Sequence, residues 1–276
     1  MRYITMSVTA TFYDHVLDAA RQEKISMAEA LAETRAMGFT LLETSFTNVQ
    51  GRVREAGREL SAAGLGISAM PAFFNFGVDP DVEKQARPVI DVAKELDVPT
   101  LLVIPGFIQE DQGDPETQTL AMIDGVKRLE ELAAQAGLGM TMEDFDGLAA
   151  PFSTSGGMLR FIEACPSLTA TFDTGNFRFM AEDELSAYQA LRRHIAHVHL
   201  KDRALAPQFG QDILHAVDGV DLYPCPVGAG SIRIPEILDL LKADGYQGIY
   251  TAEHYGADPM LECLRRSAQW LKEHLA

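Results

Sequence analysis

Two short segments of the sequence, Thr169–Asp173 (TATFD) and Ala196–Leu200 (AHVHL), have the alternating pattern of β-strands. Successive side chains of a strand point to opposite faces, so the polar residues of each segment share one face and the apolar residues share the other. The polar face ends in Asp173 in the first segment and in His199 in the second. Each segment therefore predicts a strand with an ionisable side chain near its C-terminal end.

The same pattern occurs in Gly139–Glu143 (GMTME) and Ile249–Glu253 (IYTAE), whose polar faces end in Glu143 and Glu253. The other strand candidates are Tyr3–Val8, Thr40–Thr44, Gly66–Met70 and Thr100–Ile104; helical patterns lie between the strands, most clearly Met27–Met37, Val53–Ala63, Asp81–Leu96 and Gln118–Ala136. Strands that alternate with helices form parallel sheets. Eight such units in 276 residues predict one (β/α)₈ TIM barrel, a single domain over residues 1–276.

Local signals support these boundaries. Ser26 immediately precedes the first of these helices, and Glu29 lies three residues after Ser26, inside the helix. This spacing is a capping-box pattern. The dipeptide Asp79-Pro80 predicts the start of the third helix, because proline is tolerated in the first turn. A further helix is expected at Pro235–Ala243. The stretch Arg203–Gly230 before it is too long for a simple turn, and long loops at the C-terminal face of a barrel often carry function.

Composition limits the classes of partner and compartment. The formal net charge is −17, which disfavours nucleic acid as a partner. Three widely spaced cysteines without a CxxC motif predict a reducing compartment rather than a disulfide framework. No apolar stretch approaches the roughly 20 residues of a membrane helix, and the N-terminus lacks a signal-peptide pattern. We therefore expect a cytoplasmic protein without a membrane partner.

In a barrel the polar faces of the strands point toward the axis, so the four ionisable residues would converge at one mouth. Three carboxylates at such short range would repel one another and raise each other's pKa, and a divalent cation removes that conflict. One strand-end carboxylate alone is usually a solvated loop residue. Four at matching positions predict a site for a single divalent metal at Glu143, Asp173, His199 and Glu253. Three oxygen ligands and one imidazole suit Mn²⁺ best, with Mg²⁺, Co²⁺ or Zn²⁺ as alternatives.

The remaining histidines are interpreted differently. His197 lies one layer deeper than His199 on the same face, so we expect a hydrogen-bonded interior residue rather than a ligand. His254 follows Glu253 and is expected to face outward or into the loop. The other histidines, among them His15, follow no pattern.

At these residues the sequence resembles the xylose isomerase-like barrels grouped as sugar phosphate isomerases/epimerases, which include ketose 3-epimerases, hydroxypyruvate isomerases and inosose dehydratases. The resemblance extends over nearly the whole chain. The matching stretches are Phe172–Asn176 (FDTGN), His197–Asp202 (HVHLKD), Pro226–Ile232 (PVGAGSI), Gly245–Gly248 (GYQG) leading to Glu253-His254, and Gly38-Phe39 leading to Glu43.

The resemblance implies that Glu143, Asp173, His199 and Glu253 are the metal ligands and that Glu143 and Glu253 double as the acid/base pair. The family often has a substrate-contacting histidine where this chain has Asn176. Asparagine donates and accepts hydrogen bonds but takes up no proton near neutral pH, so we expect Asn176 to contact the substrate in a different way.

Other residues near the predicted mouth are candidates for contact with the substrate. Phe74 and Phe107 follow the third and fourth strands, and their rings either pack on the substrate or simply cap the barrel. Lys201 and Arg203 are candidates to hold an anionic group, with a Lys201–Asp202 ion pair as the alternative. Glu43 is expected near the metal and the substrate. The glycine-rich loop at residues 228–230 lies where many barrels bind phosphate, which leaves a phosphorylated substrate open.

Such a site supports three reactions that begin with removal of a proton α to a carbonyl: epimerisation, aldose–ketose isomerisation, and dehydration. Our leading prediction is a metal-dependent isomerase or epimerase that acts on a small ketose or related hydroxy-carbonyl compound. An inosose-type dehydratase is the alternative, and a non-catalytic barrel subunit is a weaker one. A nuclease with three zinc ions is disfavoured by the net charge of −17 and by the few positioned histidines. Assembly into a homo-oligomer is left open.

Overall fold

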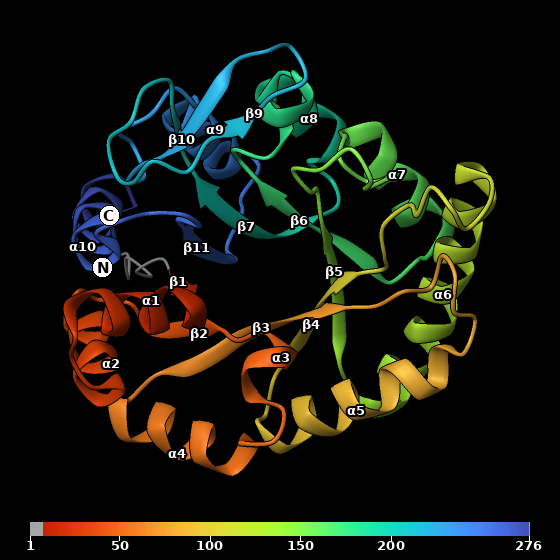
Figure 1. Cartoon of the computed structure of the whole chain (residues 1–276), viewed down its shortest axis with the longest axis horizontal. Helices are drawn as coiled ribbons and strands as arrows, with labels where there is room; N and C mark the ends of the chain where they lie inside the picture. Colours follow the sequence, from red (N-terminus) through yellow and green to blue (C-terminus); the bar gives the residue numbers. More distant parts are fainter. Residues whose placement is uncertain (1–7, 276) are drawn as a thin grey trace.

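The computed structural model describes residues 8–275, which form a closed barrel of parallel strands surrounded by helices (Figure 1). The barrel strands are β1 (Val8–Phe12), β2 (Leu41–Glu43), β3 (Gly66–Phe73), β4 (Thr100–Ile104), β5 (Gly139–Glu143), β6 (Leu168–Asp173), β7 (Ile195–Lys201) and β11 (Ile249–Glu253). They follow chain order around the barrel, and β11 closes it against β1. The predicted (β/α)₈ TIM barrel is confirmed.

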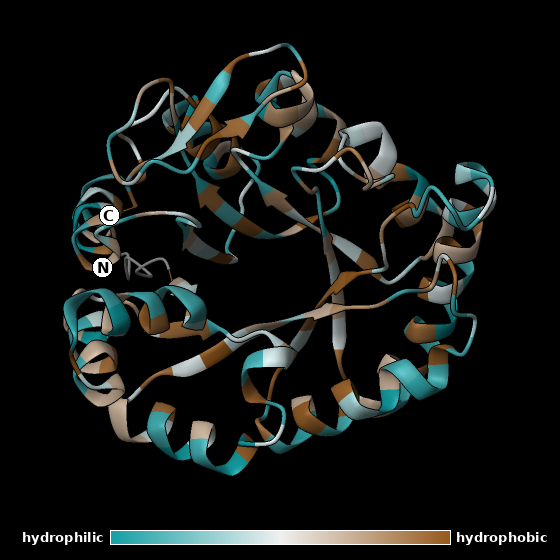
Figure 2. Ribbon diagram, in the orientation of Figure 1, coloured by the Kyte–Doolittle hydropathy of each residue, from teal (hydrophilic) through white to brown (hydrophobic). Residues whose placement is uncertain are grey.

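The helices form the outer layer of the barrel (Figure 1). They are α1 (Tyr13–Glu23), α2 (Met27–Ala36), α3 (Phe46–Val49), α4 (Val53–Ala63), α5 (Val82–Glu95), α6 (Pro115–Ala136), α7 (Ser155–Ala164), α8 (Glu184–Leu191), α9 (Ile234–Ala243) and α10 (Met260–His274), with a 3₁₀ helix, η1 (Phe177–Met180). Figure 2 shows many hydrophilic residues along these outer helices. Among the described residues, no helix is long and apolar enough to cross a membrane.

The alternation along the strands sorts side chains as expected. Phe172 of β6 and Val198 of β7 belong to the hydrophobic core between the strands and the helices. Thr171 lies on the other face of β6, where its hydroxyl is 2.8 Å from that of Thr141. Apolar side chains thus hold the helices onto the barrel, while polar side chains of β5, β6, β7 and β11 face its interior.

Helix boundaries follow their caps. Ser26 caps α2 with the predicted capping box, since its side chain accepts from the backbone N–H of Glu29 and the Glu29 side chain accepts from the N–H of Ser26. The predicted helix start at Asp79-Pro80 is wrong, because α5 begins at Val82. Asp81 caps that helix by accepting a hydrogen bond from the backbone N–H of Lys84, at 3.1 Å.

The first strand ends later than predicted. We expected Tyr3–Val8, most of which lies outside the described residues, whereas the described strand β1, Val8–Phe12, continues to Phe12. Its register is set by pairing with both neighbours, for example Phe12 opposite Glu43 of β2. A period-of-two pattern fits several registers equally well, and only the neighbouring strands choose one. The shift brings the residues after Phe12, rather than those after Val8, to the barrel mouth.

The long stretch between β7 and α9 contains a small antiparallel sheet. Its strands are β8 (Arg203–Ala204), β9 (Leu214–His215) and β10 (Asp221–Pro224), in the order β8-β10-β9. Arg203, at the start of β8, pairs with Pro224 of β10. This sheet extends the end of β7 beyond the barrel and gives Arg203 a fixed backbone position.

Candidate functional site

The four predicted metal-ligand residues come together at the C-terminal mouth of the barrel. Glu143, Asp173 and Glu253 are the last residues of β5, β6 and β11, and His199 lies near the end of β7. Each residue can offer one ligand atom, and these atoms all lie within 4.8 Å of one another. All four side chains are buried. They could therefore hold a metal ion.

His199 is oriented by carboxylates on both sides of its ring. Its Nδ1 lies 2.6 Å from Oε1 of Glu143 and 3.0 Å from Oε2 of Glu253. Its Nε2 lies 2.9 Å from Oε1 of Glu43. Although burial opposes it, Glu143 and Glu43 raise the pKa of His199 well above its ordinary value, so the metal-free ring carries a proton on each nitrogen. When a metal displaces the proton on Nδ1, the ionised Glu43 keeps the other proton on Nε2, because a carboxylate only accepts hydrogen bonds. The lone pair of Nδ1 then faces Glu143 and Glu253, which is the orientation that metal coordination requires.

Glu43 lies behind His199 in a second buried cluster. Its Oε1 is 2.7 Å from Nε2 of His197 and accepts a hydrogen bond from Oγ1 of Thr251 at 2.6 Å. Although burial acts to raise it, His199 and His197 hold the pKa of Glu43 well below its ordinary value. Glu43, His197 and His199 are also close enough to share an ion. That ion would need the lone pair of Nε2, so the neutral ring of His199 cannot serve both sites at once.

The three carboxylates of the first cluster have an electrostatic conflict without a cation. Burial, reinforced by the charges of Glu253 and Glu143, raises the pKa of Asp173 well above its ordinary value. Burial also raises the pKa of Glu143, with Glu253 acting in the same direction. A divalent cation would relieve both effects because it favours the ionised forms.

Two carboxylate oxygens in this cluster also lack a donor of proper hydrogen-bond geometry among residues 8–275. They are Oδ2 of Asp173 and Oε2 of Glu253. Each is within ion-pair distance of a cationic side chain, Lys201 at 3.3 Å and His199 at 3.0 Å respectively. The other oxygen of Asp173 accepts from the backbone N–H groups of Gly175 and Asn176. Buried oxygens that remain without a hydrogen bond fit a metal-binding set.

Lys201 is the cation that the structure provides beside these carboxylates. Its buried ammonium contacts Oε1 of Glu253 and Oδ2 of Asp173 and donates to Oδ1 of Asn176 at 2.7 Å. Although burial opposes it, Asp173 and Glu253 raise the pKa of Lys201. The alternative expectation, a Lys201–Asp202 ion pair, is wrong, because the Asp202 carboxylate accepts hydrogen bonds from the backbone instead.

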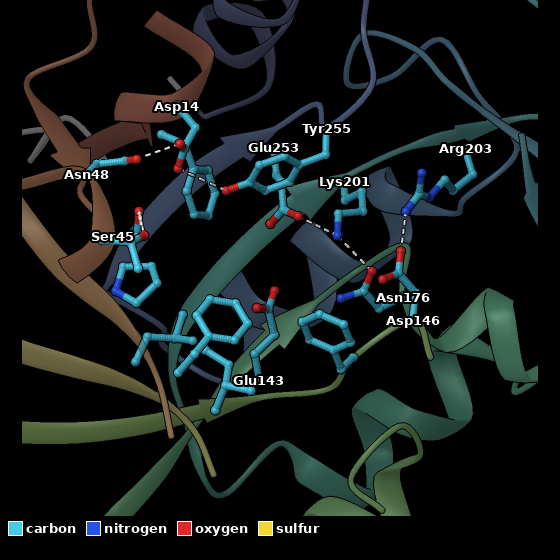
Figure 3. A pocket seen from close by; sticks show the side chains of 17 residues that line it. Asp14, Ser45, Asn48, Glu143, Asp146, Asn176, Lys201, Arg203, Glu253 and Tyr255 are labelled. Carbon is cyan, nitrogen blue, oxygen red and sulfur yellow. Dashed lines mark hydrogen bonds and ion pairs between the residues drawn. The ribbon is translucent and has the colours of Figure 1, made fainter. Parts of the chain in front are cut away.

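A pocket of about 400 Å³ opens above the cluster (Figure 3). Its lining includes Glu143, Glu253, Asn176, Lys201 and Arg203, together with Phe12, Pro71, Phe73, Leu102, Ile104, Phe145, Asp14, Ser45, Thr47, Asn48, Asp146 and Tyr255. Asp173 and His199 lie beneath it and are fully buried. The pocket therefore presents two of the four possible ligands directly to a substrate.

Three of the predicted substrate contacts are placed elsewhere. Phe74 is not on the lining; it is buried and stacks on Phe76 with 4.6 Å between ring centroids. Phe73 lines the pocket instead, because β3 extends to that residue and alternates sides from Pro71. Phe107 is also off the lining and packs against Phe145, which does line the pocket. Glu43 is fully buried and off the lining, where it contacts His199, His197 and Thr251.

Sequence reasoning missed one wall of the pocket. Asp14 accepts from the side chain of Asn48 at 2.5 Å and from the hydroxyl of Tyr255 at 3.4 Å. Asp14 lies in the first turn of α1, directly after β1, and Tyr255 lies in the turn after β11, so both are at the barrel mouth. Their position after strand ends was the available signal, but the predicted first strand ended too early for Asp14 to be noticed.

His254 was expected to face outward or into the loop, but it is buried against α1. Its ring is buried and stacks on the ring of His15, with centroids 5.7 Å apart and an interplanar angle of 15°. The backbone N–H of His254 donates to Nε2 of His15 at 2.8 Å. Burial lowers the pKa of His254 to about 4, so its ring is neutral near pH 7. Helix α1 covers the end of β11 and encloses these two rings.

The glycine-rich loop, the candidate phosphate site, is folded around an internal carboxylate. Oδ2 of Asp202 accepts from the N–H groups of Gly228 and Gly230, at 3.0 and 2.9 Å. Oδ1 accepts from the N–H groups of Ile232 and Arg203, at 3.1 and 2.8 Å. A Cβ atom at Gly230 would lie 2.2 Å from Oδ1 of Asp202, so only glycine allows this approach. The amides that could hold a phosphate are therefore already used.

Comparison with known proteins places this arrangement in context. An inosose dehydratase of Geobacillus thermodenitrificans is 30% identical over 140 residues, which covers 48% of this chain and less than half, 45%, of that protein. The structure of the probable 3-DHS dehydratase of Bacillus anthracis aligns with a TM-score of 0.74 at 17% identity, covering 97% of this chain and 99% of that one. A D-tagatose 3-epimerase-like protein aligns with a TM-score of 0.73 at 19% identity, covering 97% of each chain.

A family match covers far more of the chain than the curated relative does. The matched region extends over residues 31–274, from α2 through α10, and so includes all four residues of the candidate metal cluster. This chain belongs to the xylose isomerase-like TIM barrel family.

Proposed function

We propose that this protein is a metal-dependent isomerase or epimerase that moves a proton α to a carbonyl on a small ketose or a related hydroxy-carbonyl compound. The observation that carries the proposal is the convergence of Glu143, Asp173, His199 and Glu253 beneath a pocket, with ligand atoms within 4.8 Å of one another. The solved structures that resemble this chain include a probable 3-DHS dehydratase, a D-tagatose 3-epimerase-like protein and an L-ribulose 3-epimerase, which supports an enzymatic role.

Glu143, Asp173, His199 and Glu253 would hold the ion, and Mn²⁺ is the proposed metal because three carboxylates and one imidazole suit it. A divalent ion at these residues would supply Lewis-acid stabilisation of the negative charge that develops on the substrate oxygens. The ring of His199 is held for this role by Glu43, as the 2.9 Å contact to Nε2 indicates.

Glu143 and Glu253 are the proposed acid/base pair. Both line the pocket, and they come from β5 and β11, which β6 and β7 separate in the barrel. They therefore reach the pocket from different directions, as two groups that serve opposite faces of one carbon must. One carboxylate takes the α proton, and the other returns a proton to the same carbon or to its neighbour. Phe73 and Phe145 on the lining would limit access of water to the intermediate.

A dehydratase is the second candidate, and Lys201 is the observation that favours it. The ammonium group contacts Glu253 and Asn176 and lines the pocket, so it lies beside the acid/base pair. A cation there would assist departure of a β-hydroxyl group after the α proton is removed. The match to an inosose dehydratase points in the same direction.

NMR in D₂O with added Mn²⁺ tests the proposal and separates the two candidates. The protein is incubated with a panel of ketoses, hydroxypyruvate and inososes. Deuterium at the carbon α to the carbonyl, with the hydroxyl groups retained, supports an isomerase or epimerase. Loss of water to give a new enone or diketone absorbance supports the dehydratase. Absence of both across the panel counts against the proposed function.

A further inference from the structure

We propose that Arg203 binds a carboxylate at the end of the substrate that lies away from the metal cluster. This inference rests on the proposed function, because the metal cluster determines which end of the substrate reacts. It adds a substrate class, namely hydroxy-carbonyl compounds that also carry a remote carboxylate, and it names a residue that selects them.

The guanidinium of Arg203 has donors that the protein does not use. Arg203 is only 7% exposed and lines the pocket. Its Nη2 donates to Oδ2 of Asp146 at 2.6 Å. Its Nε–H is buried and finds no acceptor among residues 8–275. A guanidinium carries five N–H donors and buried donors are almost always paired, so a ligand with acceptor oxygens in the pocket would complete the hydrogen bonding of this group.

The pocket is electrically polarised along its length. Figure 3 shows Arg203 and Asp146 on one side, beyond Lys201 and Asn176 as seen from Glu253, and Asp14 on the opposite side. Asp14 is held there by Asn48 and Tyr255. Asp146 is balanced by Arg203, whereas no cation among the described residues pairs with Asp14, so an anionic end of the substrate would be repelled at Asp14 but not at Arg203. The charges thus favour a single orientation of an acidic sugar in the pocket.

The backbone of Arg203 is fixed, so its side chain starts from a rigid position. Its N–H donates to Asp202, and its carbonyl accepts from both the N–H and the hydroxyl of Ser231, each at 2.8 Å. Asp146 then holds one corner of the guanidinium in place. A pre-oriented guanidinium loses less entropy on binding than a mobile one.

A carboxylate suits this position better than a phosphate. A carboxylate has two oxygens in a plane and matches the planar edge of a guanidinium. A phosphate group needs more donors, and the nearby amides of Gly228, Gly230 and Ile232 are already bound to Asp202. The loop that serves phosphate in many barrels is therefore closed to it here.

Three ligands that differ only at one carbon test the proposal: D-fructose, D-fructuronate and D-fructose 6-phosphate, which end at C6 in a hydroxyl, a carboxylate and a phosphate. Their dissociation constants are measured by calorimetry on the Mn²⁺-loaded protein. We expect D-fructuronate to bind at least about tenfold more tightly than the other two ligands. Arg203→Met should remove that advantage, so that D-fructuronate binds no more tightly than D-fructose, while Arg203→Lys should retain part of it.

Asp146→Asn provides a test of opposite sign. The asparagine oxygen can still accept a hydrogen bond from Arg203 and hold the guanidinium, but the negative charge that competes with the ligand is removed, so D-fructuronate should bind several-fold more tightly than to the unaltered protein. Arg160→Met is the matched control, because Arg160 is an exposed arginine that pairs with Glu116 outside the pocket. It should change none of the three affinities. A variant that merely loosened the fold would weaken all three ligands together.

The proposal is overturned if D-fructuronate binds no more tightly than D-fructose, if the phosphate ester binds best, if Arg203→Met weakens D-fructose and D-fructuronate equally, or if none of the three binds. The proposed function is judged separately, by deuterium exchange in D₂O. A carboxylate preference without proton exchange would contradict the function alone, and proton exchange without that preference would contradict the role of Arg203 alone.

Discussion

His199 connects two buried networks through the two nitrogens of one ring. Nδ1 faces Glu143 and Glu253, and Nε2 faces Glu43. Glu43 is itself held by His197 and Thr251, so its carboxylate has little freedom to turn away. Glu43, which His197 and Thr251 hold in place, therefore determines that Nε2 of His199 keeps its proton. None of these three residues lines the pocket.

Replacing Glu143 by Gln should reduce solvent-deuterium incorporation into substrate by at least about 100-fold, because an amide cannot accept the α proton. Glu253→Gln should have a similar effect. Glu163→Gln, at an exposed position on α7, is the matched control and should retain full exchange. Metal content is measured for each variant, because both active-site residues are also proposed ligands. Full exchange in either metal-loaded variant would exclude that carboxylate from proton transfer.

Glu43→Gln should weaken binding of Mn²⁺ by about 10- to 100-fold without preventing folding. The amide keeps the size of the side chain but loses the negative charge that favours a proton on Nε2 of His199. Calorimetric titration of Mn²⁺ into the metal-free variant gives the affinity, and circular dichroism checks the fold. An unchanged affinity would show that Glu43 does not orient the ring for coordination.

Among the elements, the barrel strands set the site and the loops set the pocket. Strand ends bring Glu143, Asp173 and Glu253 to one level because parallel strands end at the same edge of the barrel. The pocket wall depends instead on loop packing, such as the segment after β7 that Asp202 organises through four backbone N–H groups.

Asp202→Asn should loosen the loop at residues 226–232. One acceptor oxygen becomes an N–H donor that faces the amides of the loop, so at least one hydrogen bond to a charged group is lost. The free energy of local opening should fall by about 1–3 kcal/mol. Hydrogen–deuterium exchange read by mass spectrometry should show faster exchange at Gly228 and Gly230. Asp91→Asn, at an exposed site on α5, is the control and should leave that exchange unchanged. Equal protection of Gly228 and Gly230 in both variants would show that Asp202 does not hold this loop.

The ends of two strands, β1 and β3, were predicted wrongly from the sequence. The end of the first strand was placed too early, at Val8 instead of Phe12. Polar and apolar residues alternate from Tyr3 to Ser7 as well as from Val8 to Phe12, and only pairing with β2 and β11 selects the register. Phe74 was chosen over Phe73 because β3 was taken to end at Met70, whereas it continues to Phe73. Neither boundary has a capping residue or glycine that would reveal it in the sequence.

At the scale of the whole molecule, ion binding and folding are linked, because the ligands come from four strands distributed over half of the barrel. An ion that binds only the folded chain stabilises it in proportion to the logarithm of its concentration. An ion bound to the metal cluster should therefore stabilise the packing of β5, β6, β7 and β11 against one another.

Saturating Mn²⁺, at about 100 times its dissociation constant, should stabilise the protein by about 2.7 kcal/mol. For a chain of 276 residues that corresponds to a rise in Tm of about 5 °C. Asp173→Asn should lose most of that shift while keeping the fold. Differential scanning calorimetry with and without Mn²⁺ measures both. A metal-induced shift that survives in Asp173→Asn would indicate binding elsewhere.

The affinity for Mn²⁺ should increase with pH above 6.5. Burial opposes it, yet Glu143 and Glu43 raise the pKa of His199 well above 6.5 in the metal-free protein. The stability contributed by the imidazolium is complete below 6.5 and is lost as pH rises through that raised pKa. A metal must displace the proton on Nδ1, so affinity should fall about tenfold per pH unit on the acid side of that pKa. Calorimetry in buffers of different ionisation enthalpy should detect proton release, and a pH-independent affinity would contradict this assignment.

The sequence by itself determined the barrel and the convergence of Glu143, Asp173, His199 and Glu253, because both follow from the period of two along a strand and from the alternation of strands and helices. Tertiary structure alone decided the burial of His254 against His15 and the closing of the glycine-rich loop around Asp202. It also decided that Asp14 and Arg203 lie on opposite sides of the pocket. Those arrangements join residues far apart in the chain, and no local periodicity records a contact between loops that meet only when the barrel closes.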